Sequence, residues 1–332
     1  MQPHTLSIGG ATYDIFVPLD RDTVQSGVTN TPAFTLPLGN KIRVKNVVET
    51  CGGGASNTAV GLARLGCHAG FCGVVGDDQW GEALRRNFEQ EGVDCSCLTV
   101  VEKEISSFSI ILSAGSGERV ILYDPGTNDH LHDVTFDREH AGKTNWVYLN
   151  HIQQETCVIE DDIIKMLSVE SGPKLTWNPG GCQIDVGISA KKNCLLLAHT
   201  HLLQLNKQEA LQFTKKKTVE DALQVLLEEG VQIVLITDGK NGSVACDSQH
   251  IYRCPVPEEN TVVDTTGAGD AFGTGVTWGL ATGRSLPEAL KAGTINATSV
   301  VGAVGAQAGL LTETEMLRRL KETPLHVDIQ PL

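Results

Sequence analysis

The sequence lacks the features that mark a secreted, membrane-spanning or nucleic-acid-binding protein. No apolar run approaches the ~18 residues of a membrane-spanning helix. The ten cysteines include no C-x-x-C pair, and with no secretory leader we expect free thiols and not a disulfide framework. Only 26 basic residues stand against 40 acidic ones, which disfavours nonspecific binding to nucleic acid or to an anionic membrane. These absences predict a cytoplasmic protein.

Two common nucleotide-binding motifs are also missing. The Gly-Lys-Thr triplet at 142–144 resembles the end of a Walker A loop, but Asp137 stands where the first glycine belongs. The glycines within 267–269 are followed by Phe272, where a dinucleotide-binding motif needs its third glycine. A dehydrogenase is therefore disfavoured.

The order of hydrophobic segments predicts an α/β protein. With 332 residues, 41% of them hydrophobic, the chain can bury a large core. Strand and helix candidates alternate from residue 146 onward, which favours a mostly parallel sheet with helices on both faces. Two β-rich stretches, approximately 12–50 and 97–124, cannot all belong to that sheet, and we assign them to a small lid.

The segment Asp264-Thr-Thr-Gly-Ala-Gly-Asp270 is the most informative feature present. It follows a β-like run at 260–263 and opens an apolar helical stretch at 271–280. A small-residue turn that enters a helix directs backbone N–H groups at an anion. Asp270, in the first turn, could accept the proton of an attacking hydroxyl. The alternative is an ordinary strand-to-helix turn with Asp270 as its N-terminal charge partner.

A second glycine-rich bend, at 52–57, leads into another helix candidate. Its glycines would let a ligand approach the backbone, and Asn57 could both donate to and accept from the hydroxyls of a polyol. The alternative is a tight turn capped by Ser56 or Asn57. Asp14, between apolar neighbours, could grip sugar hydroxyls or could be a surface charge on the lid.

Asn206 and Glu209 open a further helix candidate after the strand-like 202–205. Three residues apart, they face the same side and could hold a hydrated Mg²⁺ beside phosphates. The same pattern is common at ordinary helix starts. His199 and His201 lack a convincing third ligand, so a metal site there is disfavoured.

Taken together, these segments resemble the ribokinase-like, PfkB-type carbohydrate kinase family over nearly the whole chain. DTTGAGDAF at 264–272 and GGGASNTAVGLARLG at 52–66 resemble its two signatures. Further matches are GVVGDDQWG at 73–81, GTNDHL at 126–131, WNPG at 177–180, ITDGKNG at 236–242 and VGAQAG at 304–309. The resemblance implies a single domain over 1–332, a three-layer α/β/α fold with a mostly parallel central sheet, and a small β-sheet lid.

The resemblance also implies roles for individual residues. Asp270 is similar to the catalytic base, and the amides of Gly267, Ala268 and Gly269 to the anion hole. The positions similar to acceptor-binding residues are Asp14, Gly53, Asn57 and Asn150. The positions similar to residues near ATP and Mg²⁺ are Asn206, Glu209, Thr237, Gly239, Gly242 and Thr294. Those similar to a monovalent-cation site, often occupied by K⁺, are Asp264 and Thr266, completed by backbone near Val300, Ala303 and Gly305.

Two departures from the family pattern bear on the acceptor. Many ribokinases carry a lysine where this chain has Gly54, and a glutamate near Asn150. Both changes disfavour ribose, and the missing lysine weakens the case for a phosphorylated acceptor. Arg43 or Lys45 on the lid could replace it.

The sequence therefore predicts an ATP-dependent kinase that phosphorylates a primary hydroxyl of a sugar or sugar-like polyol, in the manner of a ribokinase or fructokinase. The resemblance implies that it uses ATP and Mg²⁺, with K⁺ as a further candidate cofactor, and that it forms a homodimer. One alternative is a nucleoside kinase of the adenosine or inosine type, acting on the 5′-hydroxyl, with the segment 23–40 stacking on the base. Another is a non-catalytic nucleotide or sugar sensor.

Overall fold

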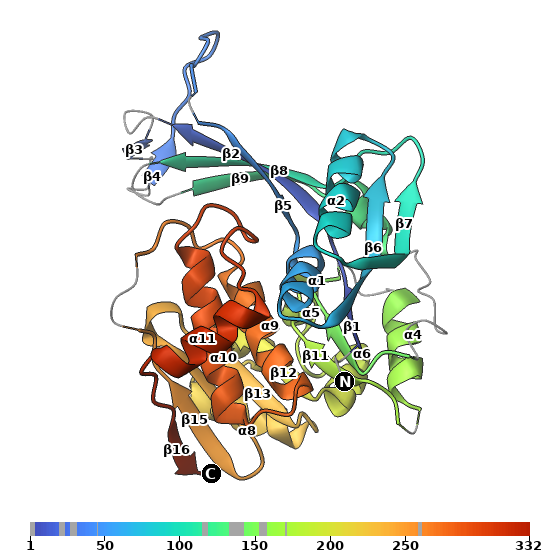
Figure 1. Cartoon of the computed structure of the whole chain (residues 1–332), viewed down its shortest axis with the longest axis vertical. Helices are drawn as coiled ribbons and strands as arrows, with labels where there is room; N and C mark the ends of the chain where they lie inside the picture. The colour runs from blue at the N-terminus through green and yellow to red at the C-terminus, as the bar shows by residue number, and fades with distance from the viewer. Residues whose placement is uncertain are drawn as a thin grey trace.

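The chain forms a large α/β body from which a small sheet extends (Figure 1). The computed structural model describes residues 4–19, 24–26, 32–44, 46–114, 119–132, 143–152, 158–169, 171–257 and 261–332. Every helix within these ranges is too short or too polar to span a membrane.

The body is built on a ten-stranded sheet with the order β16-β15-β14-β13-β12-β11-β10-β1-β6-β7. Its strands are β1 (His4–Ile8), β6 (His68–Gly76), β7 (Asp94–Val101), β10 (Trp146–Leu149), β11 (Lys174–Trp177), β12 (Leu202–Asn206), β13 (Ile233–Thr237), β14 (Ser243–Cys246), β15 (His250–Cys254) and β16 (Asp328–Pro331). Neighbours from β7 to β13 are parallel, and β14, β15 and β16 are added antiparallel at one edge. The predicted mostly parallel sheet is confirmed.

Helices cover both faces of this sheet, as the alternation of its apolar side chains requires. On β12, Leu203 and Leu205 pack into one buried cluster, whereas Leu202 packs into another. The first face is covered by α4 (Val158–Leu167), α5 (Gly181–Val186), α6 (Lys191–His199), α7 (Lys207–Thr214) and α8 (Val219–Glu228). The opposite face is covered by α1 (Gly54–Arg64), α2 (Gln79–Gln90), α9 (Ala268–Ala281), α10 (Leu286–Val301) and α11 (Glu313–Glu322).

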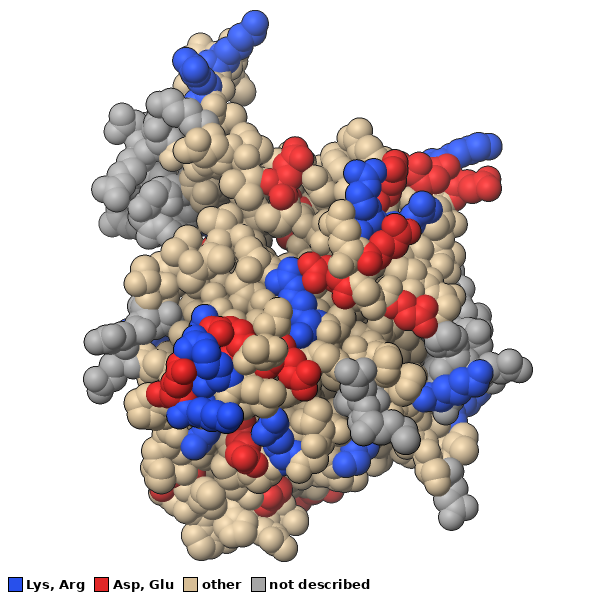
Figure 2. Space-filling view, viewed as in Figure 1, with Lys and Arg blue, Asp and Glu red and all other residues tan. Residues whose placement is uncertain are grey.

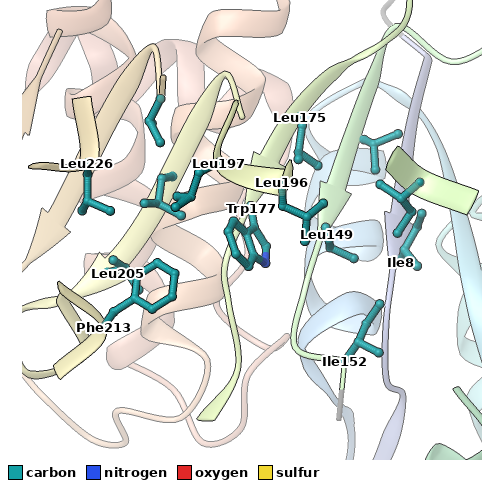
Figure 3. Packing of buried hydrophobic residues seen from close by; sticks show 14 of the residues in the cluster. Ile8, Leu149, Ile152, Leu175, Trp177, Leu196, Leu197, Leu205, Phe213 and Leu226 are labelled. Atoms are coloured by element: carbon teal, nitrogen blue, oxygen red, sulfur yellow. The ribbon is translucent and has the colours of Figure 1, made fainter. Parts of the chain in front are cut away.

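Large apolar side chains fill the first of these layers. Figure 3 shows Trp177 in its middle, with Leu205 and Phe213 on one side and Leu149 and Ile8 on the other. The rings of Trp177 and Phe213 meet edge to face with centroids 5.9 Å apart. This continuous core fixes the carboxyl ends of the parallel strands, where the polar residues described below lie.

The small sheet has the order β5-β2-β8-β9 and is mixed. Its strands are β2 (Thr12–Leu19), β5 (Val48–Gly52), β8 (Phe108–Ala114) and β9 (Arg119–Asp124), and a separate two-stranded ladder joins β3 (Val24–Ser26) to β4 (Pro32–Phe34). The segment 35–44 is exposed and projects at the top of Figure 1, and Figure 2 shows Lys and Arg side chains at its tip. Over the rest of the face in Figure 2, acidic and basic side chains are interspersed.

Two sequence-based assignments are wrong in detail. Residues 97–101, assigned to the lid, belong to β7 of the large sheet, because β7 pairs in parallel with β6 and buries Cys97 in the body core. The β-like run before Asp264 forms no strand in its described part, 261–263. Its Val263 N–H donates to Val301 O at 2.7 Å, at the end of α10. High β-propensity does not make a strand where no neighbouring strand is available for pairing.

Candidate active site

The amino end of α9 is shaped by a glycine. Gly267 is the N-cap and has φ 74°, in the left-handed region. A Cβ at this position would lie 2.4 Å from Ala306 Cβ, so only glycine lets the turn approach the 304–309 loop. The first-turn amides of Gly269 and Asp270 have no intrahelical acceptor, which is the arrangement that favours an anion.

Asp270 lies in this first turn and is half-buried. Asn57 Nδ2, on α1, donates to Asp270 Oδ2 at 2.8 Å. Burial raises the pKa of Asp270 to about 6, and the Asn57 hydrogen bond acts in the opposite direction. The structure therefore joins the two glycine-rich segments, 213 residues apart in sequence, at one carboxylate. A carboxylate with this pKa is ionised near neutral pH and still basic enough to accept a proton.

Asn57 does not cap its own helix. The N-cap of α1 is Gly53, with φ 91° and no side-chain capping bond. The capping alternative for Ser56 and Asn57 is wrong, because both side chains are buried and turned towards other elements. A Cβ on Gly53 would lie 2.7 Å from Gly10 O, so the bend at 52–54 packs directly on the turn after β1.

A cavity of about 100 Å³ opens beside this bend. Gly53, Gly54 and Asn150 line it, together with Asn128 and His151. Asn150 Nδ2 donates to Thr58 Oγ1 at 3.0 Å. Asn150 Oδ1 and Asn128 Oδ1 are both buried without a hydrogen-bond partner. Two unpaired amide acceptors on residues that line a cavity are suited to hydroxyl donors that come within reach of them.

Asp14 is buried on β2, with 6% of its surface exposed, so the surface-charge alternative is wrong. Burial raises the pKa of Asp14 to about 6, a hydrogen bond with Ser109 lowers it, and the Asp264 carboxylate raises it further. Its Oδ2 is so close to Gly52 that a Cβ there would lie 2.1 Å away. The small sheet therefore places a second carboxyl near the 52–57 bend.

Asp264 holds its own loop against the 304–309 loop. Its Oδ1 accepts from Thr266 N at 3.0 Å and from Thr266 Oγ1 at 2.8 Å, and its Oδ2 accepts from Gly305 N at 3.0 Å. Arg119, from β9, donates to Asp264 Oδ1 at 3.1 Å and to Thr265 Oγ1 at 3.0 Å. The small sheet and the loop before α9 are thus joined by an ion pair.

The residues predicted for a monovalent cation are partly brought together. Asp264, Thr266 and Gly305 are in direct contact, and Val300 O accepts from Ala303 N at 3.0 Å just beyond α10. Among the described residues no group of three His, Cys, Asp or Glu side chains could hold a metal ion. A cation near Asp264 would share that carboxylate with the guanidinium of Arg119.

The residues predicted to contact the nucleotide lie at the ends of adjacent strands. Asn206 ends β12 and is paired in register with Thr237, which ends β13. Asn206 and Glu209 form a capping box, with Asn206 Oδ1 accepting from Glu209 N at 2.9 Å and Glu209 Oε2 accepting from Asn206 N at 2.8 Å. Burial raises the pKa of Glu209. Their contacts in this structure are those of an ordinary helix start. The Mg²⁺ role stays a prediction, which depends on their oxygen atoms being ligands that Mg²⁺ prefers.

The other nucleotide candidates follow β13 or lie in the core. Gly239 begins the 3₁₀ turn η3 (Gly239–Asn241), and Gly242 has φ 86° with Cys254 O only 2.3 Å from the place of a Cβ. Thr294 is 4% exposed on α10, and its Oγ1 lies 3.3 Å from Cys254 Sγ. The structure therefore places Thr294 in the interior and not on an open surface.

Sequence reasoning missed several side chains that support the site. Gln204 Nε2 donates to Gly269 O at 2.8 Å, and Tyr148 Oη donates to Gln204 Oε1 at 3.0 Å. Asn128, Arg119 and Gln307 were also given no role. Gln204 could have been found from its position, because a glutamine inside the apolar strand 202–205 must find partners.

Comparison with known proteins identifies relatives over most of the chain. The model of the pfkB family of carbohydrate kinases matches residues 24–313. Ribokinase from Haemophilus influenzae is 28% identical over 299 residues, which cover 89% of this chain and 94% of that protein. Aminoimidazole riboside kinase from Salmonella typhimurium is 29% identical over 279 residues, covering 80% and 84%. The structure of Arabidopsis thaliana ribokinase complexed with ribose and ATP superimposes with a TM-score of 0.80 and 23% identity, over 97% of this chain and 99% of that one.

Proposed function

The chain belongs to the pfkB family of carbohydrate kinases and is an ATP-dependent kinase, and from this premise we propose that it phosphorylates a primary hydroxyl of a neutral sugar or sugar-like polyol. Asp270 is the proposed base. It accepts the hydroxyl proton while the hydroxyl oxygen bonds to the γ-phosphorus of ATP and the bond to the ADP oxygen breaks. The products are ADP and the phosphate ester. The observation that carries the proposal is the pairing of Asp270 with Asn57 at the amino end of α9.

The acceptor cavity supports a neutral ligand. No Lys or Arg is among its described lining residues, so no such cation there would neutralise a phosphate or a carboxylate on the acceptor. Asp14 and Asp270 are not part of this lining, so the acceptor would extend beyond the cavity to reach them. The unpaired Oδ1 atoms of Asn128 and Asn150 can accept from hydroxyl groups. Arg43 lies on the exposed projecting segment, and Lys45 lies outside the described residues.

The amino end of α9 suits the transferred phosphoryl group. Backbone N–H donors and the helix dipole stabilise charge on that group without rearranging during the reaction. Mg²⁺ bound with ATP would neutralise charge on the phosphate oxygens. The oxygen atoms of Asn206 and Glu209 would hold it, and a K⁺ ion near Asp264 and Gly305 would support the adjacent loop.

We further propose that residues 1–332 act as one kinase domain and that the small sheet closes over the acceptor. Exclusion of water would prevent ATP hydrolysis without transfer. β9 presents Val120, Ile121, Leu122 and Tyr123 with 40–52% of their surfaces exposed. Such an apolar strand supports the proposal of a homodimer formed through the small sheets.

A nucleoside is the second candidate acceptor, because Tyr123 lines the cavity and can stack on a base. The likeness to aminoimidazole riboside kinase supports the same candidate. The segment 23–40, proposed from the sequence for this role, lies partly outside the described residues, and residues 35–40 are exposed.

An acceptor panel tests the proposal. ADP release would be measured with pentoses, hexoses, polyols, nucleosides, a sugar acid and a sugar phosphate. We expect the highest kcat/KM with a neutral sugar or polyol, and values at least about tenfold lower for the two anionic acceptors. A preference for nucleosides would support the second candidate, and no phosphorylation across the panel would support a sensor.

A variant of the proposed base tests its role. Asp270→Asn should lose about 10²–10⁴-fold in kcat while ATP binding is retained. Wild-type turnover in this variant would exclude Asp270 as the base.

A further inference from the structure

A chain of side-chain amides leads from the surface to Asp270. Asn87 Nδ2, on α2, donates to Gln307 Oε1 at 3.0 Å. Gln307 Nε2 donates to Asn57 Oδ1 at 3.2 Å and to Ser56 Oγ at 3.0 Å. Asn57 Nδ2 then donates to Asp270 Oδ2 at 2.8 Å. Helices α1 and α2 are thus connected to the 304–309 loop and to α9 by hydrogen bonds that all point the same way.

The direction of these bonds follows from the chemistry of Asp270. An ionised carboxylate can only accept hydrogen bonds, so Asn57 must present its NH₂ group to it. The carbonyl of Asn57 then faces Gln307 and needs a donor, which only the NH₂ group of Gln307 can supply. The carbonyl of Gln307 in turn needs the NH₂ group of Asn87. If Asp270 were protonated and donated to Asn57, each of the three amides would have to exchange the positions of its NH₂ group and its carbonyl oxygen.

Gln307 is held rigidly in this position. Its side chain is buried, with 6% of the residue exposed, and its backbone carbonyl accepts from Arg64 Nη1 at 2.8 Å. Arg64 is itself fixed by a two-pronged pair with Glu91, with distances of 2.8 and 2.6 Å. Asn87 and Gln307 also line an open cavity of about 360 Å³ between α2 and β5, so the outer end of the chain lies near solvent.

We propose that Gln307 is a positioning residue, which fixes Asn57 with its donor towards Asp270 and thereby keeps the base ionised and one of its oxygens free for the acceptor hydroxyl. The catalytic consequence rests on the proposed function. The orientation of Asn57 does not, because it follows from the hydrogen bonds alone. Gln307 acts through Asn57 and itself has no contact with Asp270 among the hydrogen bonds of the described residues.

Any test must distinguish the titration of Asp270 from that of the other titratable groups near it. Tyr148, on β10, is buried, and the Asp270 carboxylate adds to the effect of burial in raising its pKa well above the usual value. Asp264 precedes the same turn and is paired with Arg119. Asp14, on β2, has a pKa of about 6, the same as Asp270. A kinetic pH profile alone would therefore not distinguish Asp14 from Asp270.

The test is a direct titration of Asp270 in the full-length protein. Protein labelled with ¹³C at aspartate carboxyls is titrated by NMR, and the Asp270 and Asp14 signals are identified by their loss in Asp270→Asn and Asp14→Asn. Gln307→Met removes the donor at nearly constant volume and should raise the pKa of Asp270 by about one unit. Gln90→Met is the matched control, because Gln90 lines the same cavity as Gln307 but is exposed and belongs to no step of the chain. It should leave the pKa unchanged.

Kinetics give the second measurement. With the best acceptor from the panel, Gln307→Met should lose about fivefold more in kcat at pH 6 than at pH 8. A base whose pKa rises by about one unit from about 6 is mostly protonated at pH 6 but still mostly ionised at pH 8. In an Asn57→Ala background the same substitution should have little further effect, since the two residues act in series. If Gln307→Met does not fold, Asn87→Leu should shift the Asp270 pKa in the same direction by a smaller amount.

An unchanged Asp270 titration in the folded Gln307→Met or Asn87→Leu protein would overturn the proposal. Full additivity of Gln307→Met with Asn57→Ala would also overturn it. A shifted pKa in a protein that phosphorylates nothing on the panel would keep the positioning role and refute the proposed function instead.

Discussion

Asp14 and Asp270 are the two carboxyls that burial makes most costly to ionise in the candidate site. The pKa of each is raised to about 6, with burial as the largest cause. Among the described residues, neither carboxyl forms an ion pair with a basic side chain. Electrostatic strain of this kind is typical of sites that bind a ligand through the same groups. An acceptor whose hydroxyls donate hydrogen bonds to these carboxylates would relieve it.

This strain predicts how stability depends on pH. A carboxyl whose folded pKa lies above its unfolded value stabilises the folded state when protonated, and that contribution is lost as pH rises from about 4 through about 6. Asp14→Asn should therefore be more stable than wild type at pH 7.5 by on the order of 1–3 kcal/mol, and the difference should shrink towards pH 4. Thermal unfolding at a series of pH values measures it.

The control is Asp129→Asn, an exposed aspartate on the 3₁₀ helix η2 (Gly126–His132), which should change the melting temperature little. A loss of stability in Asp14→Asn at pH 7.5 would show that the carboxylate is a net stabilising group there, contrary to the interpretation of the site.

At the scale of elements, α9 carries the proposed base and approaches both the sheet and the 304–309 loop closely. A Cβ on Gly273 would lie 1.9 Å from Gln204 Oε1 and 2.0 Å from Tyr148 Oη. Gly267 makes the equivalent close approach to Ala306 at the amino end. The two glycines let the helix rest on Gln204, which holds the Gly269 carbonyl. The first-turn amides are therefore fixed before a ligand binds, which is the condition for effective charge stabilisation.

We expect Gly267→Ala to displace the amino end of α9. Its Cβ would clash with Ala306, in addition to the cost of about 1 kcal/mol for a left-handed alanine. The kcat should fall by about 10² or more, as when oxyanion donors are misplaced. Gly283→Ala is the matched control, because Gly283 has φ 79° but no atom within 4 Å of the added Cβ.

Both variants would be measured for turnover and for unfolding free energy. The control should lose stability and keep turnover. Equal activity in the two variants would mean that the approach of Gly267 to Ala306 does not matter for the reaction.

At the scale of the whole molecule, Arg119 connects the small sheet to the body. Its pairing with Asp264 and Thr265 holds β9 against the loop that leads into α9. The guanidinium is about one-third exposed, with a side-chain value of 32%, so solvent screens the pair and its contribution to stability is small. Its effect should be on the position of the small sheet.

Arg119→Met should loosen this connection. We expect faster amide hydrogen exchange in β9 and at 264–266, together with a higher KM for the acceptor. Arg86→Met provides the control, because Arg86 forms an exposed pair with Glu82 inside α2 only. Unchanged exchange at both segments in Arg119→Met would show that the small sheet is positioned by its other contacts.

The sequence by itself determined the fold class, the glycine-rich turns and the carboxylate at the start of α9. Apolar periodicity gave β10 at residues 146–149 and the helix 271–280 within α9. Local signals suffice for such features because turn geometry, helix starts and buried strands depend on neighbouring residues. The kinase family followed from the order of the same motifs.

Only the tertiary structure decided which segments meet. Residues 97–101 lie in the large sheet and not in the small one, and 261–263 have no partner strand. Gln307 contacts Asn57, which is 250 residues away in sequence. An amide can donate or accept, and a strand can pair with any free edge, so residue type alone does not select the partner. The partner is selected by packing of the whole chain, which brought the amides of Asn57 and Gln307 together and left Asn128 Oδ1 and Asn150 Oδ1 unpaired.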